Sequence, residues 1–203
     1  MNYRRLLSGA LCAVVLCGGP KSEAQEKSPG QDQMNEMMKK WKEIAAPGNP
    51  HKKLDMFVGT WDVETRMWMG GPEAPPTTTR GSTTFAWTVG GRYLRQDFRG
   101  EMAGMPVEGM GYTGYDNFEK KYVGVWMDNT TTAIFSMEGT MNREGTVLTM
   151  YGKMDEWMTG EVGKMSKYVF RVLDKDTIVF EIHDLAIGEP NTKVVEMTFT
   201  RKK

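Results

Sequence analysis

The sequence predicts an all-β protein, an up-and-down antiparallel β-barrel of about ten strands with an N-terminal helical segment. From Trp61 to the end of the chain, apolar and polar residues alternate with a period of two, which is typical of half-buried strands. Turn-forming residues separate one such stretch from the next at short intervals. No helical pattern interrupts this series, so we expect each strand to pair with the next along the chain.

The first 24 residues have the three-part plan of a secretory signal peptide. Two arginines precede an apolar run over residues 6–17, and small residues follow it, ending with Ala24 before Gln25. The run is too short to span a bilayer. We therefore predict a signal peptide over 1–24, with the mature protein exported to the periplasm or secreted. Lipoprotein anchoring through Cys17 is a less favoured alternative, because bulky Leu16 precedes this cysteine.

The mature chain lacks the residues that several classes of site require. Both cysteines, Cys12 and Cys17, lie in the signal peptide, so disulfides, thiolate catalysis and cysteine metal sites are excluded. Without the three basic residues and one acidic residue of 1–24, 23 basic residues remain against 25 acidic ones. The sequence contains no stripe of basic residues, so we expect no nucleic-acid partner. No other segment is long and apolar enough to be a transmembrane segment, and we expect a monomer.

The chain is rich in methionine, with 18 residues of this type. Methionine adapts to irregular cores and cavity walls. Dense pairs of methionines would instead indicate capture of a soft metal such as Cu(I). Here the methionines are spread over most of the predicted strands, which favours the first interpretation. We expect no metal and no cofactor.

The N-terminal segment, residues 25–49, contains a polar tail and an amphipathic helix. Its apolar residues recur at intervals of three and four, the spacing of one helix face; they are Met34, Met37, Met38, Trp41, Ile44 and Ala45. Pro47 ends this helix. Asn49 and Pro50 then resemble an N-cap followed by the first helical residue, which predicts a short second helix over 51–58 that ends at Gly59.

The barrel domain is expected over residues 50–203. In the first strand, Trp61, Val63, Thr65, Met67 and Met69 alternate with mostly polar residues. The ten predicted strands are 60–69, 79–89, 92–100, 106–116, 119–128, 131–141, 145–154, 163–173, 177–186 and 192–201.

The connections between these strands alternate between two kinds. Tight turns are predicted at 90–91, 116–118, 142–145 and 174–176. Longer loops are predicted at 70–81, 100–106, 155–163 and 187–192, while 128–130 is a short exception. In a meander, odd and even connections lie at opposite ends, so one end of the barrel is closed by turns and the other carries larger loops. This asymmetry indicates a cavity that opens at the loop end.

The short helix, the Gly-Thr-Trp that opens the first strand and the long first loop resemble lipocalins and the wider calycin group. The segments "HKKLDMFVGTWDV", "VGGRYL", "GYTGYDNFEKKYVGVWMD" and "MEGT" resemble more closely the bacterial family called domain of unknown function 1579. This resemblance covers roughly residues 50–201 and implies a closed calycin-like barrel. It implies little about function. Ten strands, not eight, and the absence of disulfides distinguish the chain from true lipocalins.

Haem-binding barrels of the nitrobindin type also begin with Gly-x-Trp, but they continue with further glycines. Here Trp61 is followed by Asp62, Val63 and Glu64, which argues against the haem role.

No catalytic residue is predicted. His51 is expected on the surface, and His183 on an exposed polar face of its strand, opposite Phe180 and its apolar neighbours. No serine occupies a nucleophile elbow, and the acidic pair at 155–156 lies in a loop. The segment "GMGYTGYD" imitates a phosphate-binding loop but precedes no helix.

The inward faces of the strands supply a candidate binding site for a small apolar or amphipathic ligand. Its predicted wall is mainly apolar with two polar groups, a usual composition for a small-molecule pocket. The candidate ligand-binding residues are Met67, Met69, Trp87, Gln96, Phe98, Tyr112, Trp126, Asp128, Met150 and Phe180. Phe85 and Met197 are also expected to point inward.

Trp61 and Arg201 are predicted to form the structural floor of the barrel. The first and last strands should meet at the tight-turn end, and the alternation in the last strand places Arg201 on the same face as Phe199. We therefore expect the Arg201 guanidinium to stack on the Trp61 indole, as the corresponding arginine does in lipocalins.

Three functions remain open from the sequence. The first is an exported barrel that binds a small apolar or amphipathic molecule. The second is an enzyme, such as an isomerase or hydrolase, with Asp128 or Asp97 as a base in the cavity. The third is a barrel filled by its own side chains that serves as a scaffold for a protein partner.

Overall fold

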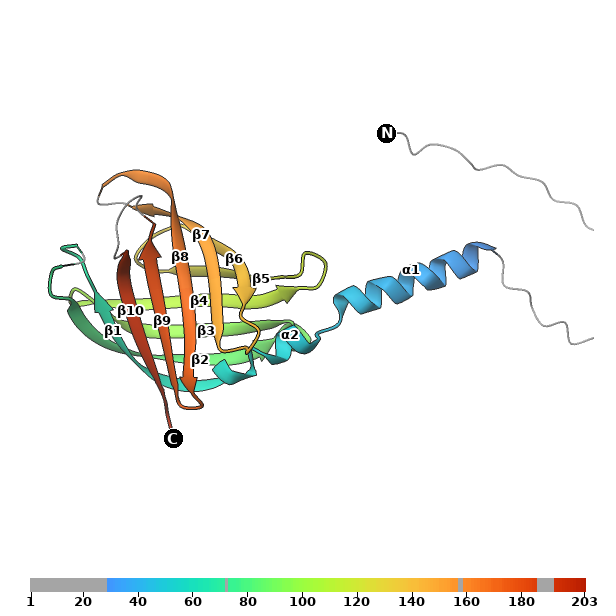
Figure 1. The fold of residues 1–203 in the computed structure, drawn as a ribbon, viewed down its shortest axis with the longest axis horizontal. Coiled ribbons are helices and arrows are strands. Elements are labelled where there is room, and N and C mark those ends of the chain that lie inside the picture. Colours follow the sequence, from blue (N-terminus) through green and yellow to red (C-terminus); the bar gives the residue numbers. More distant parts are fainter. Residues whose placement is uncertain (1–28, 72, 157–158, 186–191) are drawn as a thin grey trace, which may run out of the picture. The chain divides into compact units, whose positions relative to one another are not determined.

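The computed structural model describes residues 29–71, 73–156, 159–185 and 192–203, and in these residues the chain forms a closed antiparallel barrel of ten strands. The signal peptide predicted over 1–24 lies outside the described residues. Strands β2–β5 cross behind β8–β10, so the barrel resembles two curved layers joined at their edges (Figure 1).

The predicted fold class is confirmed, with each strand paired to the next along the chain and β1 paired to β10. The strands are β1 Gly59–Met67, β2 Thr77–Thr88, β3 Tyr93–Met102, β4 Met105–Asp116, β5 Lys121–Asp128, β6 Phe135–Met141, β7 Val147–Glu156, β8 Glu161–Asp174, β9 Thr177–Asp184 and β10 Lys193–Arg201. The closure aligns Trp61 with Arg201 and Met67 with Val195.

The predicted amphipathic helix is present as α1, Pro29–Ala45, and ends just before Pro47. The predicted second helix is split. It consists of α2, Asn49–Lys52, and a single 3-10 turn at Asp55–Phe57. The N-cap of α2 is Gly48, not Asn49 as predicted. None of the described helices has the length and apolar character needed to cross a membrane.

His51 is buried, with 4 % of its surface exposed, which corrects the prediction of a surface residue. Its Nδ1 accepts a hydrogen bond from the Gly48 backbone N–H at 3.1 Å, and its ring meets Tyr115 edge-on. Burial lowers the pKa of His51, and the nearby charge of Arg92 lowers it further. The imidazole therefore stays neutral at physiological pH and serves as a structural acceptor at the start of α2.

The floor is the barrel end formed by the β2–β3, β4–β5, β6–β7 and β8–β9 turns, together with residues 54–61. Leu54 and Trp61 are fully buried here, and Phe57 is 3 % exposed. The Phe57 ring packs against Phe85 at 5.8 Å and Phe170 at 5.4 Å between centroids. Side chains therefore fill this end completely, and the residues just before β1 close it.

Trp61 and Arg201 make the contact that the alternation predicts. The Arg201 guanidinium lies 4.0 Å from the centroid of the Trp61 ring, and the indole N–H donates to the Phe57 carbonyl at 2.8 Å. Arg201 also donates to the carbonyls of Val58 and Met56, at 2.6 and 2.9 Å. These bonds tie the last strand to the 3-10 turn, so the arginine satisfies backbone acceptors that the short helix leaves free.

The opposite end, the mouth, is the end at which β1, β3, β5, β7 and β9 finish and the strand after each of them begins. Two predicted lengths are wrong here. Residues 100–106 form a tight hairpin, in which Met102 pairs with Met105 and the turn residues Ala103 and Gly104 both have positive φ. The segment after Asp128 is longer than predicted, because β6 begins only at Phe135.

Candidate binding site in the barrel

A cavity of about 390 Å³ occupies the barrel between the filled floor and the mouth. Side chains and backbone from β1 and from β3–β10 surround it. The volume lies within the range of about 300–1,000 Å³ that is typical of small-molecule pockets. The barrel is therefore not filled by its own side chains along its whole length.

The wall of this cavity is mainly apolar, and aromatic residues and methionines supply its largest side chains. The residues that carry this character are Met67, Phe98, Met102, Trp126, Phe135, Met137, Met150, Met154, Tyr168, Phe170, Phe180 and Met197. Several rings touch one another: Phe170 and Phe180 are 4.3 Å apart between centroids, and Phe98 meets Trp126 edge-on at 6.4 Å. The rings provide rigid apolar surface, and the methionines can adapt to an occupant.

Two glycines of β4 make room for the indole of Trp126. A Cβ at Gly109 would lie 2.3 Å from Trp126 Cζ2, and one at Gly111 would lie 2.8 Å from Cε3. Both glycines face the cavity, since Gly111 is aligned with Trp126 and Gly109 with Asp128. The segment "GMGYTGYD" resembles a phosphate-binding loop in sequence. In the structure, its first two glycines provide the flat surface on which the Trp126 ring lies.

Polar groups of the cavity are few and are concentrated toward the mouth. Asp128 Oδ2 accepts the indole N–H of Trp126 at 2.8 Å, and Oδ1 accepts the backbone N–H of Thr130 at 2.9 Å. Gln96 borders the middle of the cavity on β3. Burial raises the pKa of the Tyr168 phenol, so its hydroxyl stays protonated at physiological pH.

The structure brings seven of the ten predicted wall residues to the cavity with the expected inward orientation. They are Met67, Gln96, Phe98, Trp126, Asp128, Met150 and Phe180. Phe85 points inward but belongs to the filled floor, and Met197 borders the cavity.

Three predicted wall residues are placed elsewhere. Met69 lies beyond the end of β1 and is 58 % exposed. Trp87 lies at the floor end of β2, where its indole N–H donates to Asp55 at 2.8 Å. Tyr112 borders the cavity, but its side chain lies on the outer face of β4, because it is aligned with the exposed Arg95 and its hydroxyl lies 3.7 Å from Met110 Sδ.

Sequence reasoning missed part of the wall, notably on β6 and β8. The missed residues include Phe135, Met137, Tyr168 and Phe170. The period-of-two pattern could have identified them, because Phe135 and Met137, like Tyr168 and Phe170, are two positions apart and so share one face of their strand.

Residues 46–201 match the family described as "Protein of unknown function (DUF1579)". The chain belongs to this family. None of the curated proteins matches the sequence. The DUF1579 match covers the whole barrel, so the resemblance quoted from the sequence segments is confirmed.

Solved structures similar to this DUF1579 chain are β-barrels or proteins of related shape. Rv2717c from M. tuberculosis is 17% identical with a TM-score of 0.56, and the match covers 78% of this chain and 100% of that one. A redesigned beta barrel is 11% identical with a TM-score of 0.40, covering 74% and 96%. EF1p2_mFAP2b bound to DFHBI is 10% identical with a TM-score of 0.42, covering 75% and 98%. The similarity to Rv2717c concerns the fold alone.

Two further titratable residues of the DUF1579 barrel face away from the cavity. Asp97, the alternative candidate base, lies on the outer face of β3 and pairs with Arg95 at 2.7 Å. His183 is also on the outer face, but it is half-buried, not exposed as predicted; Nε2 lies 3.6 Å from Glu181 Oε2. Burial lowers the pKa of His183 despite the opposing effect of this carboxylate.

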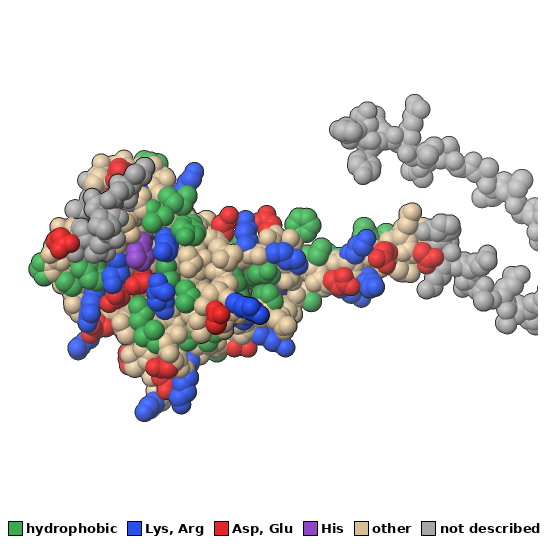
Figure 2. Space-filling model, viewed as in Figure 1, with side chains coloured by type: hydrophobic (Ala, Val, Ile, Leu, Met, Phe, Trp, Pro, Cys, Tyr) green, Lys and Arg blue, Asp and Glu red, His purple; other side chains and the backbone are tan. Residues whose placement is uncertain are grey.

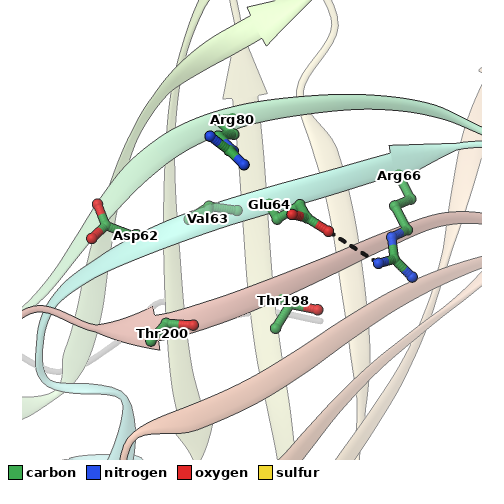
Figure 3. A pocket seen from close by; sticks show the side chains of 7 residues that line it. All are labelled: Asp62, Val63, Glu64, Arg66, Arg80, Thr198 and Thr200. Atoms are coloured by element: carbon green, nitrogen blue, oxygen red, sulfur yellow. Dashed lines mark hydrogen bonds and ion pairs between the residues drawn. The ribbon is translucent and has the colours of Figure 1, made fainter.

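A second hollow, of about 290 Å³, lies on the outer surface over β1, β2 and β10 (Figure 3). Three of its four charged residues form ion pairs: Glu64 pairs with Arg66 at 3.1 Å, and Asp62 pairs with Lys202 at 3.0 Å. Acidic and basic side chains are likewise interspersed over the barrel face shown in Figure 2. The inner cavity, with its apolar wall, is therefore the better candidate site.

Proposed function

We propose that this barrel binds a small apolar or amphipathic molecule in its central cavity. The observation that carries the proposal is the cavity of about 390 Å³, whose wall is mainly apolar and rich in aromatic rings and methionines. Such a wall favours an apolar occupant because burial removes apolar surface from water. A barrel that served only as a filled scaffold would leave no space of this size.

The direct test is uptake of N-phenyl-1-naphthylamine, a neutral probe whose fluorescence rises in apolar surroundings. Met67 borders the cavity, whereas Met69 has the same side chain two residues later and is 58 % exposed. Met67→Gln should weaken probe binding roughly three- to tenfold, which corresponds to about 0.6–1.4 kcal/mol. Met69→Gln should leave it unchanged. Absence of probe binding to the wild-type protein, or equal loss in both variants, would refute the proposal.

The natural occupant can be sought by native mass spectrometry of the protein purified from its own host. A bound molecule should appear as a defined mass increment that is released on unfolding. The same increment should decrease in Met67→Gln and persist in Met69→Gln.

We further propose that the barrel works outside the cytoplasm, after removal of residues 1–24. The support is the order of arginines, apolar run and small residues at the N-terminus. Intact-mass analysis of the protein from its host should give a chain that begins at or close to Gln25. A chain that retains Met1 would refute export by this route, and a lipid-modified Cys17 at the N-terminus would identify a lipoprotein instead.

A further inference from the structure

The charged groups around the cavity all have the same sign. Four acidic residues border it, namely Glu101, Asp128, Asp155 and Glu156, and no lysine, arginine or histidine does so among the residues that the structure describes. Because an apolar cavity screens charge poorly, a uniform set of carboxylates creates a negative potential at the mouth.

One lysine lies at the same rim, but its charge is already neutralised. Lys164 is aligned with Met154, a residue of the cavity wall. Its ammonium group lies 2.7 Å from Asp184 and 3.0 Å from Glu161, and these carboxylates raise its pKa. The ion pairs hold Lys164 away from any ligand, so it does not offset the negative potential of the mouth.

Asp128 is the carboxylate best placed to meet a ligand. It lies on the inward face of β5, next to the Trp126 ring, at the point where the strand reaches the mouth. Its described hydrogen-bond donors, the indole of Trp126 and the backbone and hydroxyl of Thr130, are all neutral. An ionised carboxylate has about four acceptor positions, so these three bonds leave its charge uncompensated and one position open.

The mouth also has a buried oxygen atom without a donor. Asp184 Oδ1, on β9, makes no hydrogen bond in the described part of the chain. Ser166, which is aligned with Asp184 and fully buried on the inward face of β8, lies beside the Tyr168 hydroxyl. A rim with carboxylates and a free acceptor favours an occupant that supplies N–H donors or positive charge.

The aromatic wall fits the same class of ligand. The faces of Trp, Tyr and Phe rings attract cations, and the attraction increases when the cation is removed from water. An anion would enter a cavity whose described border offers no positive charge, at a substantial desolvation cost.

We propose that the ligand of the cavity is a cationic amphiphile, in which an amine or quaternary ammonium group pairs with Asp128 at the mouth and an apolar body lies among the rings. This inference rests on the proposed function and adds the chemical class of the ligand.

The test compares three decyl compounds that differ only in their polar end. Decyltrimethylammonium, decanol and decanoate, each below its critical micelle concentration, displace N-phenyl-1-naphthylamine from the protein at pH 7.5. We expect the cation to displace the probe at a concentration at least tenfold lower than the anion, with decanol between them. Equal displacement by cation and anion, or preference for the anion, would overturn the inference while leaving apolar binding intact. Absence of probe binding would overturn the proposed function itself.

Two charge variants assign the selectivity to one side chain. Asp128→Asn keeps the shape and one acceptor oxygen, and it should reduce the preference for the cation over the anion to less than about threefold. Asp97→Asn removes the same charge from the outer face and should keep the preference. A preference that survives in Asp128→Asn, with circular dichroism like that of the wild type, would overturn the role of Asp128. If Asp128→Asn does not fold, the order of the three compounds on the wild-type protein still decides the class of ligand.

Discussion

Trp61→Ala is expected to lower the free energy of unfolding by about 3–5 kcal/mol, the usual cost of removing a large aromatic side chain from a packed core. The Trp61 side chain is fully buried at the floor. Its removal would leave a void beneath the Arg201 guanidinium and take away the donor that satisfies the Phe57 carbonyl. An unpaired buried carbonyl adds its own cost to that of the void.

Chemical denaturation followed by circular dichroism would measure this loss. Trp68→Ala is the matched control, because Trp68 lies just past β1, is half-buried and makes a looser contact with Lys193 at 5.1 Å. We expect that control to cost less than about 1 kcal/mol. If the two variants lost equal stability, the closed floor would not be the main anchor of the fold.

Gly139→Ala is expected to destabilise the barrel by about 1–3 kcal/mol, the cost of overpacking a close contact. A Cβ at Gly139 on β6 would lie 2.0 Å from the Thr149 carbonyl oxygen and 2.6 Å from Met150 Cα. Both atoms belong to the backbone of β7, so strands β6 and β7 would have to separate. A methyl group is tolerated only where neighbouring side chains can move aside.

Gly124→Ala provides the comparison on the next strand. Gly124 also faces inward, but its nearest neighbour would be Met137 Cγ at 3.2 Å, in a flexible side chain. Thermal denaturation should show a clearly lower Tm for Gly139→Ala than for Gly124→Ala. The reverse order would show that the close approach of β6 and β7 does not depend on Gly139.

Strand number, strand order and barrel closure were predictable from the sequence because they follow from local patterns. The period of two marks the strands, and turn residues mark their ends. The contact between Trp61 and Arg201 was predictable for the same reason. It requires only that both side chains lie on the inward faces of their strands and that the first and last strands pair at the floor. Local patterning was less informative about loops, as the tight hairpin at Ala103 and Gly104 shows.

The inward face of β4 could not be derived from hydrophobic alternation. Its outer face carries Met110 and Tyr112, whereas its inner face carries Gly109 and Gly111. Hydrophobicity alone therefore assigns Tyr112 to the inside. In the structure Tyr112 points outward instead. The indole of Trp126 on the neighbouring strand occupies the inner face of β4, and only residues without a Cβ leave room for it there.

The sequence by itself determined an all-β chain of ten strands in the DUF1579 family, with an aromatic floor where the first and last strands meet. These properties depend on residues that are close along the chain, or on the alternation of side chains between the two faces of a strand. Only the tertiary structure decided that a cavity of about 390 Å³ remains open above the floor, and that its charged border is acidic. Open volume and local potential depend on how side chains from nine strands fill one shared space, and no single segment of sequence contains that information.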